Sequence, residues 1–364
     1  MAGNGAAEGL AVLAGLGLPD VHVVSDMAQA LETLRGLAPS AQPMRVEAGD
    51  EPPAPTKAAL DSDGDSLLSP SPLAAFALGQ GSPVLVQGAT GKVAGRHMAL
   101  MRSYGTNIVA GVTPFKGGVE ADGVPIYDSV AQAVAAHEIE ASIIFVPGPF
   151  AADAALEAAR AGIPWGICIT EGIAQQDMLA ALPAIRRTGA RLVGPNTPGV
   201  IVPGRTKIGI MPAEPFTPGP VAVFSRSGTL TYEAAARLSA AGIGQSFCIG
   251  VGGDPFTGLS FIDCLRLAAD DPQTQAVLLI GEIGGRAEED AADFIRSSGY
   301  SKPVAAFVAG ITAPPGKRLG HAGAILEEST GGAGRKLAAL RGAGLSLCAG
   351  LDEIPAAVRA FLQD

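Results

Sequence analysis

Histidine, cysteine and tryptophan are scarce in this sequence. Its 364 residues include four histidines, four cysteines and one tryptophan, and charged residues make up only 16%. The cysteines show no CxxC spacing, so the sequence predicts neither a zinc site nor a disulfide framework. We therefore expect a reducing compartment, the cytoplasm or an organelle matrix, and no metal on this chain.

Positive charge is also in short supply. The chain has 25 Lys and Arg against 35 Asp and Glu, a formal net charge of -10. General nucleic-acid binding needs clustered cations, so we expect no nucleic-acid partner, although a local cationic pocket for a small anion stays possible. The early apolar run "LAVLAGLGL" is too short to span a bilayer and has no basic residues before it. We read it as neither a membrane anchor nor a secretory signal.

Apolar residues and glycine are abundant, and their arrangement predicts an α/β protein. Short β-rich runs such as "PVLVQG" and "AVLLIG" alternate with alanine-rich helical stretches. This alternation predicts doubly wound parallel sheets whose ligands bind at the carboxyl ends of the strands. The predicted divisions are a helix-strand-helix extension (1–38), a flexible linker rich in Pro, Ser and Asp (39–80), a first α/β domain (81–200), a proline-rich linker (201–218) and a second α/β domain (219–364).

The first domain begins with a glycine-rich turn, "GATGK", between a strand and a helix. Gly88, Thr90 and Gly91 would let backbone N–H groups and the helix N-terminus approach a phosphate. The pattern is only a loose dinucleotide fingerprint, and no acidic residue for a ribose follows about 20 residues on. Lys116 stands there instead and suits an extra phosphate, as in coenzyme A or NADP. The alternative is a tight turn that serves packing alone.

A second turn of this kind, "SRSGT", precedes the first helix of the second domain. Ser225, Arg226, Ser227 and Gly228 lie between strand and helix, and Thr229 begins the helix. Hydroxyls, backbone N–H groups, a helix dipole and a guanidinium converge there, which predicts an anion site. The alternative is an ordinary helix N-cap made by Ser227 or Thr229, and this stretch alone does not decide between the two.

Glu282 directly follows the apolar strand "AVLLIG" and is flanked by glycines. A carboxylate at the carboxyl end of a strand is placed for a site. It could equally cap the next helix, but Glu288, Glu289 and Asp290 already supply acids to that first turn.

His321 lies in a glycine and proline loop, "GKRLGHAGAI", after another predicted strand. Because the loop has no apolar face, a functional role is favoured over a core position. No second ligand follows at the spacing of a metal pair.

Several motifs, in this order, resemble the α subunit of succinyl-CoA synthetase (succinate–CoA ligase). They are "QGATGK", "GVTPFKGG", "ITEGI", "GPNTPGV", "SRSGTLTYEA", "GVGGDP", "DPQTQAVLLIGEIGG" and "VAGITAPPGKRLGHAGAI", and the likeness covers nearly all of 82–364. The resemblance implies an N-terminal Rossmann-like CoA-binding domain followed by a flavodoxin-like CoA-ligase domain, both with parallel sheets.

The resemblance also implies roles for individual residues. His321 matches the histidine that carries phosphoryl between nucleotide and acid, in a glycine loop that lets it swing. Glu282 matches the glutamate that orients this ring, "SRSGT" the helix end that receives the phosphate, and Tyr232 a substrate contact. The matching coenzyme A positions are Gly88, Thr90, Gly91, Lys92, Val93, Lys116, Ile169, Thr170 and Glu171.

Three features depart from the family pattern. Val93 stands where the family usually has glutamine, and Thr197 stands where "NCPG" usually has cysteine. The N-terminal extension is similar to the closing helix-strand-helix of the family's β subunit, as in fused relatives such as ATP-citrate lyase.

The implied function is that of an α subunit in a nucleotide-dependent acid–CoA ligase. ATP or GTP with Mg²⁺ would bind a separate ATP-grasp β subunit, in a heterodimer or heterotetramer, and the substrates would be CoA and a small dicarboxylic acid. Alternatives are a malate- or citrate-CoA ligase subunit, and a non-catalytic CoA-binding regulator. An NAD-type dehydrogenase is disfavoured by Lys116 and by the missing ribose acid. The acid, the nucleotide and the assembly stay open.

Overall fold

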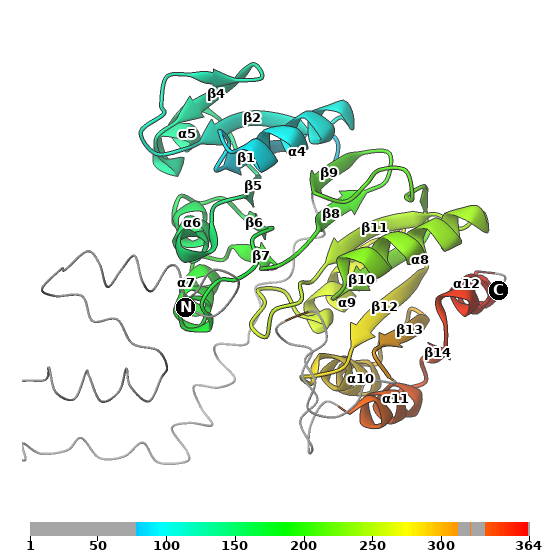
Figure 1. Cartoon of the computed structure of the whole chain (residues 1–364). Coiled ribbons are helices and arrows are strands. Elements are labelled where there is room, and N and C mark those ends of the chain that lie inside the picture. Colours follow the sequence, from blue (N-terminus) through cyan, green and yellow to red (C-terminus); the bar gives the residue numbers. More distant parts are fainter. Residues whose placement is uncertain (1–77, 312–320, 322–331, 363–364) are drawn as a thin grey trace, which may run out of the picture. The chain divides into compact units, whose positions relative to one another are not determined.

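The structure is a computed structural model that describes residues 78–311, 321 and 332–362 (Figure 1). The predicted extension 1–38 and nearly all of the predicted linker 39–80 lie outside these residues. Within the described part, no helix is long and apolar enough to cross a membrane.

The first sheet is a Rossmann-type sheet. Its order is β3-β4-β2-β1-β5-β6-β7, and every pairing is parallel except that of β3 with β4. Numbered along the chain, the parallel strands read 3-2-1-4-5-6, the dinucleotide-binding order. The strands are β1 (Pro83–Gln87), β2 (Asn107–Val112), β3 (Glu120–Ala121), β4 (Val124–Tyr127), β5 (Ala141–Ile144), β6 (Trp165–Cys168) and β7 (Arg191–Val193).

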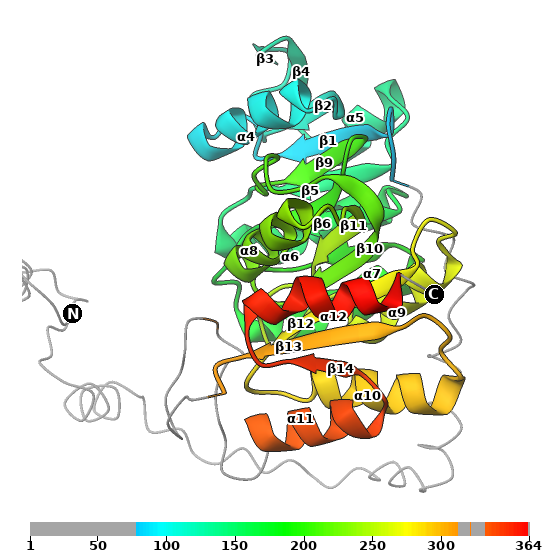
Figure 2. The ribbon, with the colours of Figure 1, turned by 90° about the vertical axis from the view of Figure 1, so that its right-hand side faces the viewer.

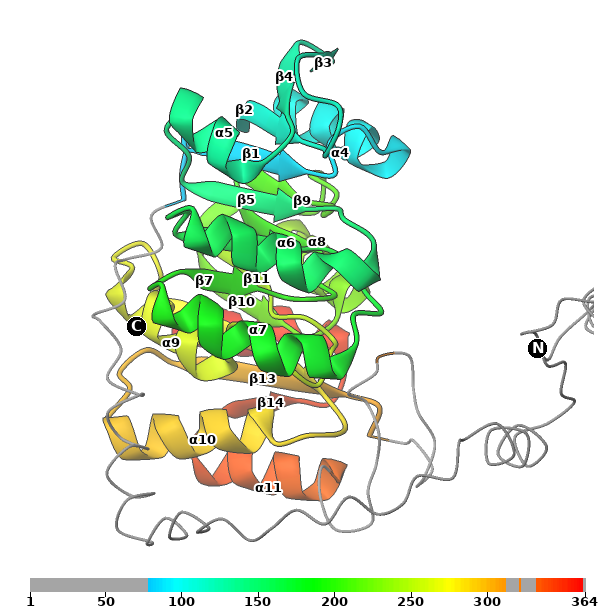
Figure 3. The same cartoon turned by 90° about the vertical axis from the view of Figure 1, so that its left-hand side faces the viewer.

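Helices pack on both faces of this sheet because successive side chains of a strand point to opposite faces. Val84 and Val86 of β1 belong to the core that includes α4 (Lys92–Ser103). Leu85, between them, packs with buried residues of α5 (Val130–Ala136) and α6 (Gly148–Arg160). α7 (Gln175–Arg187) packs against α6 (Figure 3). Both faces are covered, as a parallel sheet requires.

The second sheet has the flavodoxin order. Its arrangement is β14-β13-β12-β10-β11-β8-β9, and the parallel strands read 2-1-3-4-5 along the chain. The strands are β8 (Gly199–Val202), β9 (Thr206–Gly209), β10 (Pro218–Ser225), β11 (Gln245–Gly250), β12 (Ala276–Glu282), β13 (Val304–Ala309) and β14 (Ser346–Cys348). The two predicted fold classes are therefore confirmed.

Helices cover both faces of the second sheet (Figures 2 and 3). Val221 and Val223 of β10 pack toward α8 (Gly228–Ala240) and α12 (Ile354–Phe361), which follows the short 3-10 helix η1 (Leu351–Glu353). Phe224 packs toward the other face, which is covered by α9 (Phe261–Asp270), α10 (Ala287–Ser298) and α11 (Ala333–Gly342). All four cysteines are free and buried, Cys168 in the first sheet and the other three in the second domain.

The segment read as a proline-rich linker, 201–218, contains regular structure. β8 and β9 form a hairpin at the edge of the second sheet, and β8 pairs antiparallel with β11. Val200, Val202 and Ile208 are buried in the core shared with the first sheet, so burial of apolar side chains holds the hairpin in place. The sheet is consequently parallel only from β11 to β14, and its other edge is antiparallel.

Candidate functional site

Each sheet has a topological switch point, which is a pair of adjacent parallel strands whose following connections lead toward opposite edges of the sheet. In the second sheet β10 and β12 are neighbours, with Ser225 opposite Ile280. The chain therefore brings Arg226, after β10, beside Glu282, at the end of β12. In the first sheet β1 and β5 are neighbours, and the turn at Gly88 follows β1. The predicted turns thus lie where α/β folds bind ligands.

A buried carboxylate joins the imidazole of His321 to a guanidinium. Nδ1 of His321 lies 2.8 Å from Oε2 of Glu282, and Oε1 of Glu282 lies 3.4 Å from Nε of Arg226. Glu282 and Arg226 are only 6% and 7% exposed, so their charges are little screened by water. The hydrogen bond to Glu282 is the main cause that raises the pKa of His321, while burial and Arg226 oppose the rise.

The loop between β11 and α9 packs against the imidazole ring of His321. A Cβ atom at Gly253 would lie 2.3 Å from Cγ of His321, so only glycine leaves room for the imidazole. The neighbouring carboxylate, Asp254, also raises the pKa of His321, and it accepts a hydrogen bond of 2.9 Å from Nδ2 of Asn196. The sequence pattern alone gives no individual role to Gly253, Asp254 or Asn196. Glycines directly after a strand, in "GVGGDP", were the available signal.

The "SRSGT" turn makes the helix N-cap that was one of the two roles considered for it. Ser227 is the N-cap of α8, since its Oγ accepts a hydrogen bond from the N–H of Leu230. Ser225 is fully buried and its hydroxyl bonds the backbone of Ser227, so it shapes the turn. Thr229 is exposed at the first turn of the helix, and Arg226 turns toward Glu282. The cap is therefore confirmed, while phosphate binding stays a prediction.

Tyr232 lies one turn into α8, close to this helix end. Its hydroxyl would be 3.6 Å from a Cβ atom at Gly228, and its ring meets Phe216 edge to face. Burial raises the pKa of Tyr232 to about 12. The phenol therefore keeps its proton at neutral pH and is available as a donor to an oxyanion.

The predicted coenzyme A residues lie at the carboxyl edge of the first sheet. Gly88 has a φ of +76°, and a Cβ atom there would meet the carbonyl group of Phe145 at 3.2 Å. Both the N–H and the hydroxyl of Thr90 lie 3.3 Å from Oγ1 of Thr113 after β2. The hydroxyl of Thr170 donates to the carbonyl of Val146. Gly91, Lys92, Val93, Lys116 and Glu171 are exposed, and Ile169 is half-buried.

One turn connects this edge to the histidine site. The N–H of Asn196 donates to the carbonyl of Thr170 at 2.9 Å, and the carbonyl of Asn196 accepts from the N–H of Gly253 at 3.2 Å. Thr197, one of the departures from the family pattern, is buried, and its hydroxyl donates to the carbonyl of Gly250. The two predicted sites are therefore joined through a single hydrogen-bonded segment.

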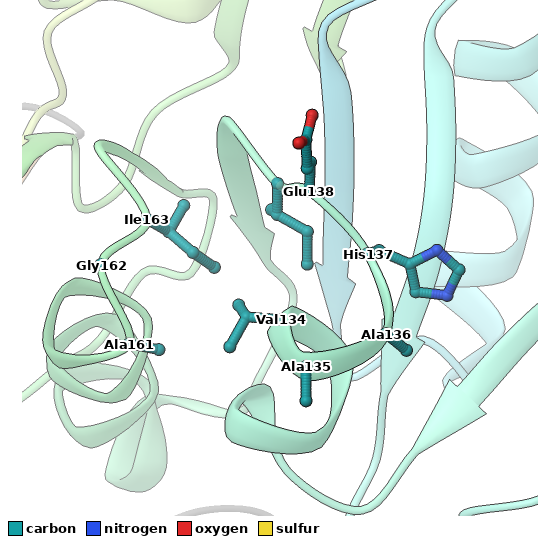
Figure 4. Close-up of a pocket in the computed structure, with 9 residues that line it drawn as sticks. Val134, Ala135, Ala136, His137, Glu138, Ala161, Gly162 and Ile163 are labelled. Atoms are coloured by element: carbon teal, nitrogen blue, oxygen red, sulfur yellow. The ribbon is translucent and has the colours of Figure 1, made fainter.

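A pocket of about 480 Å³ lies elsewhere, where α5 and α6 end (Figure 4). Val134 and Ile163 line it, whereas the imidazole of His137 points away and lies 2.9 Å from the hydroxyl of Tyr127. These helix ends precede the amino ends of β5 and β6, the edge opposite to the predicted coenzyme A residues. Across the described residues, no group of three or more His, Cys, Asp or Glu side chains is placed to hold a metal ion.

Fold and site together define an α/β protein with a candidate ligand site at the switch point of each sheet, and comparison with known proteins identifies the family. The family model for a CoA binding domain matches residues 80–172, and that for a CoA-ligase matches 224–345. Subunit alpha 2 of the ADP-forming succinate–CoA ligase of Archaeoglobus fulgidus is 56% identical over 261 residues, which cover 72% of this chain and 90% of that subunit. The alpha subunit from Aquifex aeolicus is 50% identical over 74% of this chain and 89% of its own length. The chain belongs to the family of succinate–CoA ligase α subunits.

A solved structure confirms the fold. ATP citrate lyase from Methanothrix soehngenii, in complex with citrate and coenzyme A, superposes with a TM-score of 0.72 at 23% identity. The match covers 79% of this chain and 50% of the lyase chain.

Replacing Gly253 with alanine should displace the imidazole. The added methyl group would overlap the ring, so the bond between Nδ1 and Glu282 should break and the pKa of His321 should fall toward the ordinary value of about 6.5. NMR titration of the histidine ring protons, with His321→Asn to assign the signal, measures this. The matched control is Gly334→Ala in α11, where a Cβ atom meets nothing within 4 Å. An unchanged pKa in Gly253→Ala would contradict the contact.

Proposed function

We propose that this chain is the subunit of a nucleotide-dependent succinate–CoA ligase that binds coenzyme A and carries phosphoryl on His321. The observation that carries the proposal is the imidazole held on a buried carboxylate at the switch point of the second sheet. The family relationship supports the reaction, because succinate–CoA ligases are the relatives that this chain matches over most of its length.

In the first step, Nε2 of His321 attacks the γ-phosphorus of the nucleotide. Nδ1 is engaged by Glu282, so Nε2 is the nitrogen that faces the incoming group in this proposal. The N–P bond forms as the bond to the nucleoside diphosphate breaks. Glu282 stabilises the partly positive phosphoimidazole, much as a carboxylate holds the histidine of a catalytic triad.

In the second step, an oxygen of the acid's carboxylate attacks the phosphorus and releases His321. The acyl phosphate then reacts with the sulfur of coenzyme A, and phosphate leaves as the thioester forms. Arg226, the N-terminus of α8 and the protonated Tyr232 are the donors proposed to hold the transferred phosphoryl group. Carrying the group on histidine divides one difficult transfer into two easier ones.

Coenzyme A is proposed to bind the carboxyl edge of the first sheet. Gly88 lets the turn after β1 pack against the backbone of Phe145, and the exposed ammonium groups of Lys92 and Lys116 offer positive charge to a phosphate there. The hydrogen bonds through Asn196 support delivery of the sulfur toward His321, because they tie this edge to the loop beneath the ring.

The nucleotide and Mg²⁺ are proposed to bind a partner subunit of the ATP-grasp type. The matched relatives are named as alpha subunits, which implies a β partner, and this sequence has no P-loop motif. Succinate is the proposed acid, with malate or citrate as the alternative, and the free buried thiols support the proposed cytoplasmic location.

His321→Asn should abolish phosphorylation of the complex. Asparagine keeps a polar side chain in the loop but offers no nitrogen nucleophile. The measurement is incubation of the chain and its coexpressed β partner with γ-labelled nucleotide, followed by acid and alkali treatment. We expect label that is acid-labile, alkali-stable and removed by succinate plus coenzyme A. Acid-stable label, or label retained in the variant, would direct attention to the serines at 225 and 227.

Glu282→Gln should slow phosphorylation and shift its pH dependence. Attack requires the neutral ring, so the rate falls as pH drops through the pKa of His321, and Glu282 keeps that pKa raised. Glutamine removes the charge, so the rate should fall by a factor on the order of 10² to 10⁴ and its acidic limb should move to lower pH. Binding of coenzyme A, measured by calorimetry, should not change. An acidic limb at the wild-type position would refute the role assigned to Glu282.

A further inference from the structure

A fully buried lysine lies among carboxylates close to the proposed phosphohistidine site. Lys336 of α11 has no exposed surface, and its Nζ contacts Oε2 of Glu288 and, at 3.1 Å, Oε2 of Glu289. Both glutamates belong to the first turn of α10 and are 1% and 7% exposed. From the sequence, Glu288 and Glu289 are expected only to supply negative charge to the first turn of α10, a role that does not require burial.

The buried cluster of Lys336, Glu288 and Glu289 hydrogen-bonds to the backbone at Glu282 and Gly285. Oε1 of Glu288 accepts a hydrogen bond of 3.0 Å from the N–H of Glu282, and Nζ of Lys336 donates to the carbonyl of Gly285 at 3.0 Å. A Cβ atom at Gly281 would lie 2.5 Å from Oε1 of Glu288, so the glutamate is in direct contact with the strand end. Both ends of the short loop from 282 to 285 are therefore held by the cluster.

Lys336 also joins two segments that the proposed chemistry must keep together. Gly285 follows Glu282 after β12, whereas Lys336 lies in the first turn of α11, the helix that follows His321 along the chain. The ammonium group of Lys336 thus links the loop after Glu282 to α11, the helix that follows the loop of His321.

We propose that Lys336 is a positioning residue for phosphoryl transfer: through Glu288 and Gly285 it holds Glu282 in the place where its carboxylate meets Nδ1 of His321. The inference rests on the proposed function of His321. Stability alone is a weak reason for such a cluster, because well-packed apolar residues often replace buried ion pairs without loss. Holding the end of β12 in place, by contrast, uses the ammonium donor of Lys336 and the carboxylate acceptor of Glu288, because both hydrogen-bond to the backbone there.

The direction in which the pKa of His321 changes distinguishes a positioning role of Lys336 from a direct electrostatic effect of its charge. Among the residues that the structure describes, the charged groups named around Glu282 and His321 are Arg226 from the turn before α8, Asp254 from the loop before α9, Glu288 and Glu289 from α10, and Lys336 from α11. Removing the positive charge of Lys336 would by itself raise the pKa of His321. Releasing Glu282 from its place would lower that pKa, because the bond to Glu282 is the main cause of its rise.

The experiment compares Lys336→Met with Lys302→Met in the full chain and in the complex with its β partner. Lys302 is a matched control, a partly buried lysine whose Nζ donates to the carbonyls of Ala268 and Asp271. Lys336→Met should lower the pKa of His321 in the NMR titration and slow its labelling on the order of 10- to 100-fold. Lys302→Met should change neither, and Lys336→Arg should restore part of the rate. A raised or unchanged pKa in Lys336→Met overturns the proposal.

A second variant keeps the test decisive if Lys336→Met does not fold. Glu289→Gln combined with Lys336→Met removes one charge of each sign, so the formal charge of the cluster is conserved. It should show the same lowered pKa and slowed labelling, and wild-type values in this double variant overturn the inference. Failure of the proposed function has a different signature, in which the wild-type complex carries no label that depends on His321.

Discussion

The hydrogen bond between Nδ1 of His321 and Glu282 is the contact on which the rest of the site depends. It fixes which ring nitrogen is engaged, raises the pKa of the ring and places a buried negative charge beside the imidazole that is proposed to carry phosphoryl. A carboxylate only 6% exposed is costly to hold in place without partners. Arg226 beside Oε1 and the imidazole of His321 at Oε2 are those partners, while the bond from the N–H of Glu282 to Glu288 holds the backbone.

The scaffold explains why these groups meet. Parallel strands place their following loops at one edge, and the 2-1-3-4-5 order makes β10 and β12 neighbours at the switch point. Residues 56 positions apart in the sequence, Arg226 and Glu282, are thereby brought within 3.4 Å. The first sheet repeats the design with the Rossmann order, and Asn196 connects the two edges. One topological rule thus positions both the proposed phosphoryl site and the proposed coenzyme A site.

Much of the fold and site could be predicted because the signals are local. Alternation of apolar strands with alanine-rich helices indicated both sheets, and Gly88, Arg226, Glu282 and His321 all stand directly after strands or in glycine loops. The β8–β9 hairpin was not predicted, because its apolar stretches are short and are interrupted by prolines that are also typical of a linker. Its strands are stabilised by the burial of Val200 and Ile208 in the core shared with the first sheet, a contact that is distant in the sequence.

The residues that sequence reasoning missed act through distant partners. Gly253 matters because a ring 68 positions later lies against it, and the glycines of "GVGGDP" do not indicate which side chain packs there. Lys336 stands in "GRKLAALRG", where a lysine beside arginines is typical of a solvated helix face. Only the packing of α11 against α10 shows that its ammonium group is buried between carboxylates.

The central claim is that Glu282 occupies Nδ1 and so directs the phosphoryl group to Nε2. The most direct measurement is phosphorus–nitrogen NMR on the phosphorylated complex with ¹⁵N-histidine, which identifies the ring nitrogen bonded to phosphorus. The geometry predicts phosphorus on Nε2 of His321, with Nδ1 still protonated and bonded to Glu282. Phosphorus on Nδ1 would contradict the account, because it requires the contact with Glu282 to be broken.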